Sequence, residues 1–227
     1  FLVLMFLGLP IPFSMLFVGV VGLTILKTPE AAAQIMVGEI TTQFSSYSLT
    51  VAPLFGLMGF IAYYTGIGSN LFTVIDKFIG HWRGGLAIAT EVACAGFGAI
   101  CGSAPATIGT MCAVAYPEMR KNNYSPTLAG PAIAAGANLA ALIPPSTTFI
   151  IYGMACDTSI GNLFIAGIVP GIVLTICFAI LIWIMALRHP DYAPRSPKAS
   201  WKERLHALKH GLVVVVGFIL VFFSCMM

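Results

Sequence analysis

The distribution of charged residues constrains this chain more than any other feature of its sequence. Lys and Arg number 11 and Asp and Glu number 8 among 227 residues, so charged residues make up 8%, whereas a soluble globular protein has about 25%. Charged side chains are absent from 1–26, 40–75, 92–117, 122–156, 158–187 and 210–227. Each stretch can hold about 18 or more helical residues, close to the length that crosses a bilayer. With apolar residues at 59%, the sequence predicts an all-α polytopic membrane protein and excludes a soluble enzyme, a nucleic-acid-binding protein and a disordered chain.

Prolines, N-cap residues and polar turns divide the chain into segments. Thr28, Ser125 and the Ser200–Glu203 pair predict helix starts, and Pro10 and Pro12 kink the first span or start its main helix. The predicted segments are spans at 1–26, 49–67 and 163–187, a short outer helix at 29–44, a mixed connector at 68–83, two apolar legs at 84–101 and 104–117, a broken helix at 126–155, an amphipathic interfacial helix at 201–210 and a last span from Gly211.

The positive charges predict an orientation for these segments. If the basic loop at 188–209 is cytoplasmic, 10 of the 11 Lys and Arg lie inside, provided that 84–117 enters the membrane and returns to the same side. The two legs of this unit are about 18 and 14 residues long, or roughly 27 and 21 Å, and the second is too short to cross about 30 Å of hydrocarbon. We therefore expect a re-entrant hairpin with its tip at Gly102 and Ser103.

The predicted tip has the chemistry of an anion site. Gly102 permits a tight reversal, while Ser103 is a good N-cap and Pro105 a good first-turn residue for the second leg. The tip would present free N–H groups and the positive end of a helix within the membrane. Ala104 and Thr107 complete the candidate substrate site at this tip.

Besides the hairpin tip, the sequence contains a second interruption of helical structure, at Pro144 and Pro145 in the broken helix. This break has the chemistry of a cation site. Neither Pro144 nor Pro145 has an N–H, so the carbonyls of Ala140 and Ala141 lose their helical donors. Carbonyls beside hydroxyl groups suit a small hard cation such as Na⁺, and two broken elements in apolar sequence are typical of a transporter's binding site. The candidate cation ligands are Ala140, Ala141, Pro144, Pro145, Ser146 and Thr147, together with Ser103 from the tip.

Two further polar residues lie in apolar sequence. Asn138 stands one turn before the Pro-Pro break, where its amide could serve the substrate, the cation or the broken backbone. Glu91 lies in the first hairpin leg, and acidic residues inside membranes are commonly functional. Two roles are open for Glu91. One is ion or proton coupling, and the other is local pairing with Arg83, eight residues away.

An enzymatic role is not expected. Ser103 as a nucleophile would need a base within hydrogen-bond reach. The four histidines all lie on or beside the predicted cytoplasmic loops, at His81, His189, His206 and His210. An intramembrane pair of aspartates and a cluster of metal-ligating side chains are also missing from the sequence.

A series of short motifs resembles the large membrane subunit of TRAP transporters, the tripartite ATP-independent periplasmic carriers. The resemblance covers nearly the whole chain in order. It is carried by Arg83-Gly84-Gly85-Leu86-Ala87, Gly102-Ser103-x-x-Ala106-Thr107, Pro117-Glu118-Met119, Tyr124, Leu142-Ile143-Pro144-Pro145-Ser146, Tyr152-Gly153 and the run from Ser159 to Gly171.

This resemblance implies one half of an inverted-repeat, elevator-type secondary transporter, multi-pass in a bacterial inner membrane. It implies Na⁺-coupled uptake of carboxylates such as C4-dicarboxylates, sialic acid or other sugar acids, with Na⁺ as coupling ion and no organic cofactor. The implied partners are a periplasmic solute-binding protein and a small membrane subunit, and no nucleic acid is expected. The resemblance places the family's hairpin motif on Gly102, Ser103, Ala106 and Thr107, and its broken-helix motif on Pro144, Pro145 and Ser146.

Under this interpretation the chain has three parts. Residues 1–83 supply scaffold-type spans and connectors, 84–162 form a transport-type unit, and 163–227 hold a return span, the cytoplasmic amphipathic helix and a truncated last span. The family's large subunit is about twice as long, so we expect that residues 1–227 alone do not transport.

Two residues depart from the family's pattern, and two alternatives stay open. Ala104 stands where a second Ser is frequent, and Glu91 where an apolar or small residue is usual. The alternatives are a membrane scaffold or assembly subunit that carries no solute, and a carboxylate–sodium symporter that works without a receptor.

Overall fold

A computed structural model describes residues 1–45, 51–194, 199–205, 207, 208 and 211. The chain divides into two units, Phe1–Thr50 and Val51–Met227. In the described ranges all regular structure is helical and no strand occurs, so the predicted all-α class is confirmed.

The first unit follows the sequence prediction closely. It comprises α1 (Leu2–Phe6), α2 (Ile11–Leu26) and α3 (Pro29–Phe44). The chain breaks before Pro10, which is the N-cap of α2, and Pro12 lies in the first turn, where a missing N–H costs nothing. Thr28 Oγ1 accepts a hydrogen bond from the N–H of Ala31 at 3.3 Å, so the predicted cap of α3 is confirmed.

The second unit begins with α4 (Val51–Tyr64), which corresponds to the predicted second span, and α5 (Ile67–Ile79). The sequence predicts only a mixed connector after this span, but α5 is a strongly amphipathic helix of 13 residues. Its buried face packs against the next two helices. Gly68 makes this possible, because a Cβ there would collide with the methyl group of Thr110 on α7 and would lie 3.2 Å from the ring of Phe97 on α6.

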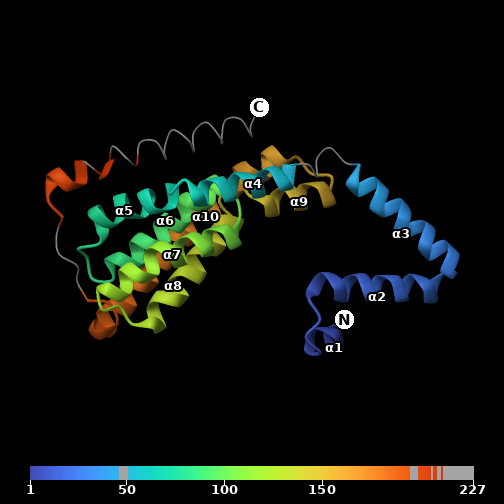
Figure 1. Ribbon diagram of the computed structural model, residues 1–227, viewed down its shortest axis with the longest axis horizontal. Coiled ribbons are helices and arrows are strands. Elements are labelled where there is room, and N and C mark those ends of the chain that lie inside the picture. The colour runs from blue at the N-terminus through green and yellow to red at the C-terminus, as the bar shows by residue number, and fades with distance from the viewer. Residues whose placement is uncertain (46–50, 195–198, 206, 209–210, 212–227) are drawn as a thin grey trace. The chain divides into compact units, whose positions relative to one another are not determined.

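Helices α6 (Gly85–Cys101) and α7 (Ala104–Lys121) form a helical hairpin (Figure 1). Gly102 ends α6 with a φ of +59°, a conformation that favours glycine, and the chain reverses there as predicted. The predicted end of the second leg at 117 is wrong, because α7 continues through Pro117 to Lys121. The last turn is stabilised by the 3.2 Å ion pair of Lys121 with Glu118. Both legs are therefore similar in length, at 17 and 18 residues or about 26 and 27 Å.

The predicted broken helix is confirmed. Helix α8 (Pro126–Asn138) runs into a short 3₁₀ turn, η2 (Leu139–Ala141), and the chain resumes as α9 (Thr147–Ala155) after the two prolines. Ser125 caps α8, with its Oγ accepting from the N–H of Thr127 at 3.3 Å.

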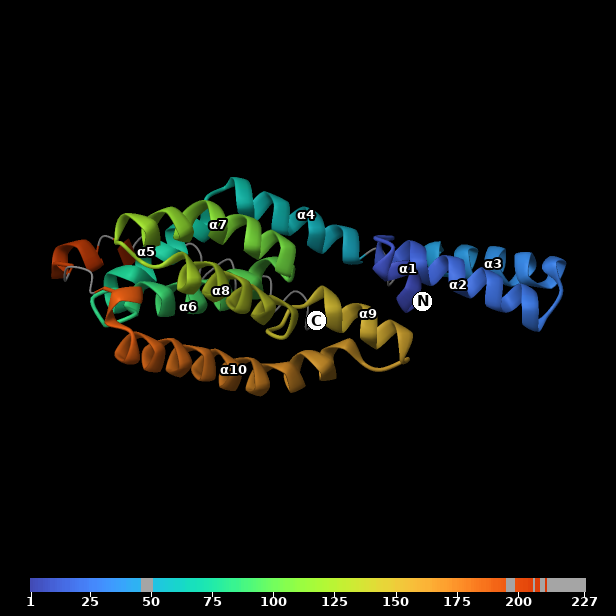
Figure 2. The ribbon, with the colours of Figure 1, turned by 90° about the horizontal axis from the view of Figure 1, so that it is seen from below.

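The unit continues with α10 (Ile160–Arg188) and the 3₁₀ turn η3 (Pro190–Tyr192). At 29 residues, or about 44 Å, α10 is long and apolar enough to cross a membrane, whereas α2 and α6 are apolar but shorter. Figure 2 shows α10 running alongside α8 and α6, and it contacts both.

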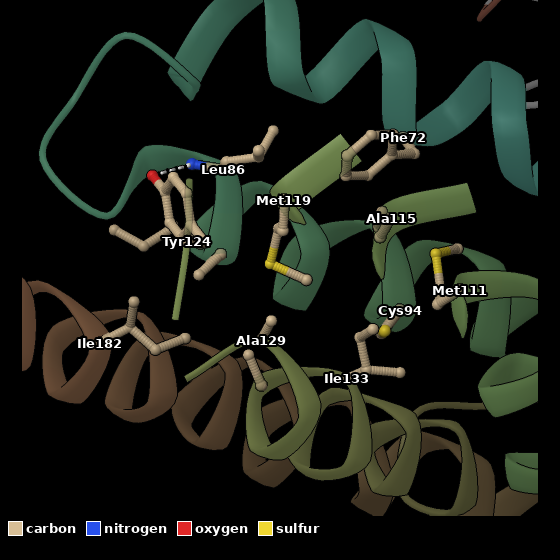
Figure 3. Packing of buried hydrophobic residues seen from close by; sticks show 14 of the residues in the cluster. Phe72, Leu86, Cys94, Met111, Ala115, Met119, Tyr124, Ala129, Ile133 and Ile182 are labelled. Carbon is tan, nitrogen blue, oxygen red and sulfur yellow. Dashed lines mark hydrogen bonds between the residues drawn. The ribbon is translucent and has the colours of Figure 1, made fainter. Parts of the chain in front are cut away.

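The core of this unit is centred on α6, which is buried along almost its whole length. Side chains from α5, α7, α8 and α10 close around it (Figure 3). At one end of the core the buried Tyr124 hydroxyl accepts a hydrogen bond from the N–H of Leu86 at 3.3 Å. Because Gly84 offers no side chain to cap α6, this tyrosine takes the place of an N-cap residue.

Part of the predicted interfacial helix is described. The N–H of Ser200 donates to Glu203 Oε2 at 2.8 Å, which confirms one bond of the predicted capping box, and residues 201–205 are helical. Trp201, Leu205 and Leu208 are exposed, as an interfacial apolar face requires. The remainder of this prediction, and the last span after Gly211, lies outside the described residues.

Candidate functional site

The hairpin tip and the broken helix meet. The carbonyl oxygen of Gly102 accepts two hydrogen bonds from Thr147, one from its N–H at 3.2 Å and one from its Oγ1 at 2.8 Å. Gly102 ends α6 and Thr147 begins α9, so the two interruptions predicted separately form one site.

At the tip, most of the backbone donors predicted to be free are already bonded. Ser103 Oγ accepts from the N–H of Ala106 at 3.5 Å, and the Ser103 carbonyl accepts from the N–H and Oγ1 of Thr107 at 3.1 and 2.9 Å. Pro105 has no N–H. Among the described contacts, the N–H of Ala104 is the first-turn donor that has no partner. Ala104 and its neighbour Ser103 are both half-buried. The tip therefore offers fewer donors than the sequence suggested.

At the break, the prediction of two unpaired carbonyls is half correct. The buried Ser146 hydroxyl donates to the carbonyl of Ala141 at 2.7 Å and so replaces the N–H that Pro145 lacks. Ala140 loses its helical donor because Pro144 has no N–H, and the N–H of Ile143 bonds instead to Leu139 at 2.8 Å. The peptide bond between the two prolines is cis.

The hydroxyl groups around this site are left as acceptors. Ser146, Thr147 and Thr107 each donate their hydroxyl proton to a backbone carbonyl. A hydroxyl that has committed its proton still has oxygen lone pairs, so these three oxygens can only accept a proton donor or coordinate a cation. The ends of α6, α7 and α9 thus supply neutral hydroxyl and carbonyl oxygens, the ligand type that hard cations prefer, although Thr107 Oγ1 already lies 3.4 Å from the thiol of Cys101.

Asn138 does not take part in the contact between Gly102 and Thr147. Its side chain is exposed, and its Nδ2 donates to the carbonyl of Ala134 in the same helix at 2.9 Å. Glu91 is also elsewhere, about 16 Å down α6 from the tip by helix rise. It makes no ion pair with Arg83 in the described structure, so the local pairing left open by the sequence is not found.

The site depends on close backbone packing that sequence reasoning missed. A Cβ at Gly98 would lie 2.6 Å from the Cα of Ala140, so α6 and η2 touch along their backbones one turn below the tip. On α4, a Cβ at Gly59 would lie 3.1 Å from the Cβ of Cys101. The four-residue spacing of Gly98 and Gly102 is typical of close helix packing and could have indicated the first contact.

Comparison with known proteins identifies the family. The model of the DctM component of the tripartite ATP-independent periplasmic transporter matches residues 1–227. The chain belongs to this family. The resemblance stated from the motifs is therefore confirmed.

Several relatives are large permease proteins of TRAP transporters. The chain is 34% identical over 222 residues to the ectoine/5-hydroxyectoine permease of Ruegeria pomeroyi, covering 95% of this chain and 51% of that protein. It is 32% identical to the C4-dicarboxylate permease of Pseudomonas aeruginosa, over 85% of this chain and 46% of the relative. The sialic acid permease of Vibrio cholerae is also 32% identical, over 94% and 51%. The chain thus spans about half the length of the relatives it matches.

Family membership settles the broad class. TRAP permeases are membrane-embedded transport proteins and not enzymes, in agreement with the prediction from the sequence. The family's description names a tripartite transporter of which DctM is one component.

Proposed function

We propose that this chain forms the first half of a Na⁺-coupled TRAP permease and that the contact of Gly102 with Thr147 organises its cation site. In the working transporter, Na⁺ lies against the carbonyl of Ala140 and the hydroxyl oxygens of Ser146 and Thr147, with Ser103 contributing from the tip. The observation that carries this proposal is the double hydrogen bond that holds the two interruptions together.

Neutral ligands favour Na⁺ over a proton as the coupling ion. The site contains hydroxyls and carbonyls that do not titrate near neutral pH, and the described residues contain no group of three or more His, Cys, Asp or Glu that could hold a metal ion. Oxygen lone pairs in such a cluster replace the hydration shell of a hard cation.

The helix termini support a carboxylate as the transported solute. Helices α7 and α9 begin at Ala104 and Thr147, so their positive ends favour a negative group, whereas the carbonyl ends of α6 and η2 on the other side of the junction favour the cation. The solutes in the names of the relatives, which are ectoines, C4-dicarboxylates and sialic acid, all carry a carboxylate at neutral pH. We assign a carboxylate-bearing solute to this chain, with Gly102, Ser103, Ala104 and Thr107 at the site and Asn138 on its exposed rim.

The family supports the remaining features of the proposal. The chain acts in a bacterial inner membrane as a multi-pass protein, beside the small permease subunit, and receives its solute from a periplasmic binding protein. The hairpin is re-entrant in this proposal, because its tip at Gly102 is bonded to Thr147 at the interruption of the broken helix. Residues 84–162 move as the elevator-type transport unit against scaffold spans at 1–83, with 163–227 as the return region.

Na⁺-dependent uptake by the complete transporter in liposomes tests the proposal. Ser103→Ala and Ser146→Ala should each raise the half-saturating Na⁺ concentration by about five- to tenfold, which corresponds to roughly 1 kcal/mol for a lost polar interaction. Ser159→Ala is a matched control, because Ser159 also caps a helix, α10, but is exposed and follows the end of α9 that lies away from Thr147. Normal uptake with unchanged Na⁺ dependence in both variants would overturn the proposal.

A further inference from the structure

A buried acid lies on the helix contact that leads to the proposed cation site. Glu91 is 1% exposed, and its Oε2 has no hydrogen-bond partner in the part of the chain that the structure describes. A Cβ at Gly136 would lie only 2.7 Å from this oxygen. The carboxyl group of α6 is therefore pressed against the backbone of α8, and a side chain at Gly136 would collide with it.

Glu91 belongs to a continuous line of close contacts. Glu91 and Cys94 of α6 face Gly136 of α8, and Gly98 faces Ala140 of η2. We call this line of five residues the α6–α8 seam. Its members on α6 are three or four residues apart, so they lie on one face of the helix, and the next residue in that series is Gly102 at the tip. The seam thus joins the carboxyl group to both halves of the proposed cation site.

No charge compensates this carboxyl group in the described structure. Helix α8 has no titratable side chain between Pro126 and Asn138, and Cys94 is the titratable neighbour on α6 itself. None of the charged residues on the other helices packed against α6 forms an ion pair with Glu91. The titratable groups of those helices are Tyr63 and Tyr64 on α4, Asp76 and Lys77 on α5, Cys112, Tyr116, Glu118, Arg120 and Lys121 on α7, and Cys177 and Arg188 on α10.

A carboxylate in such a place would be strongly unfavourable. A buried ion without a partner loses its hydration and gains nothing in return, so the group takes its neutral, protonated form instead. The neutral acid fits the narrow gap beside Gly136. Loss of the proton to water would leave a negative charge that requires hydration, and Oε2, the oxygen against Gly136, is out of contact with water while the seam is closed.

We propose that Glu91 is a proton-binding site and that its proton keeps the α6–α8 seam closed, so that Gly102 and Ala140 stay together at the cation site. This inference rests on the proposed function and adds a proton requirement to Na⁺ binding. Opening the seam at Glu91 separates α6 from η2 at Gly98 and Ala140, about 10 Å along the helix. Na⁺ and the Glu91 proton then bind cooperatively, because both stabilise the closed seam.

The first test measures Na⁺ affinity against pH in the complete transporter. If Na⁺ binding requires protonated Glu91, the half-saturating Na⁺ concentration of the wild type rises at alkaline pH by up to about tenfold per pH unit. Glu91→Gln cannot ionise and has nearly the same shape, so its Na⁺ affinity should stay constant over the same range. Glu118→Gln, at the exposed end of α7, is the matched control and should retain the wild-type profile.

A second readout detects the proton on the carboxyl group directly. Infrared spectra of the wild type should contain the C=O absorption of a protonated carboxylic acid at neutral pH, and this band should disappear at the alkaline pH where Na⁺ affinity falls. The band should be missing in Glu91→Gln. A wild-type pH profile of Na⁺ affinity in Glu91→Gln, or no protonated-acid band in the wild type, would overturn the inference. Uptake that ignores Na⁺ while the band is present would instead contradict the proposed function and leave the proton site standing.

Discussion

The carbonyl oxygen of Gly102 accepts hydrogen bonds from both the N–H and the hydroxyl of Thr147, at 3.2 and 2.8 Å. This contact joins residues 45 positions apart, one at the end of α6 and one at the start of α9. A carbonyl at a helix end normally lacks an intrahelical partner, and here the broken helix supplies two donors. The pair therefore fixes the hairpin tip against the Pro-Pro break.

Thr147→Val should weaken this contact selectively. Valine keeps the branched shape but removes the hydroxyl, so the Gly102 carbonyl retains a single bond and the cation site loses an oxygen. We expect a loss of about 1 kcal/mol in the free energy of unfolding and about a fivefold rise in half-saturating Na⁺. Thermal unfolding and Na⁺-dependent uptake of the complete transporter measure both effects.

Thr73→Val provides the control for this variant. Thr73 Oγ1 also donates to a backbone carbonyl at 2.8 Å, but within α5 and in an exposed position. Its loss should leave Na⁺ affinity unchanged. Equal Na⁺ affinities in the two valine variants would argue against a role for Thr147 as a ligand.

Gly98→Ala should disturb the contact between α6 and η2. The new Cβ would lie 2.6 Å from the Cα of Ala140, and a backbone atom cannot move aside without shifting its helix. Overpacking of this kind costs about 1–3 kcal/mol. Gly96→Ala is the paired control, since its Cβ would meet the movable tip of Leu71 at 2.9 Å. If Gly96→Ala destabilised the protein as much in thermal unfolding, the proposed backbone contact would be wrong.

Tyr124→Phe should destabilise the opposite end of the hairpin. The phenylalanine fills the same space but leaves the buried N–H of Leu86 without its acceptor, which costs about 1–3 kcal/mol. Tyr192→Phe is a suitable control, because Tyr192 is partly exposed and bonds Ser125 through its backbone carbonyl. A Tyr124→Phe variant as stable as the wild type in thermal unfolding would show that the hydroxyl does not cap α6.

The same tyrosine predicts a pH dependence. Burial raises the pKa of Tyr124 from 10 to about 12, because the charged phenolate is disfavoured away from water. Its contribution to stability is therefore complete below pH 10 and is lost as the pH rises through about 12. The wild type should lose stability more steeply than Tyr124→Phe in this window when unfolding is followed at increasing pH. Parallel curves would contradict the assignment.

Local interruptions of the helices could be predicted from the sequence because each has a local cause. Pro144 and Pro145 remove backbone donors, Gly102 permits a positive φ, and Ser103 and Ser125 accept from first-turn N–H groups. These effects act within a few residues, so they can be predicted from a single sequence.

The relationships between distant segments could not be predicted in the same way. The bond from Thr147 to Gly102 and the cap that Tyr124 gives to α6 depend on tertiary packing across 45 and 38 residues. The continuation of α7 beyond Pro117 was missed because the polar run from Glu118 to Asn123 is typical of a turn between two apolar legs. In this helix the burial of Met111, Ala115 and Met119 in the core outweighs the one backbone bond that Pro117 cannot make.

Direct Na⁺ binding to the purified, complete permease tests the central claim most closely. Calorimetric titration without solute should give saturable Na⁺ binding in the wild type and an affinity reduced by about tenfold in Ser146→Ala, with K⁺ giving no signal. Wild-type Na⁺ affinity in Ser146→Ala, or no Na⁺ binding to the wild type, would contradict a cation site at the junction of Gly102 and Thr147.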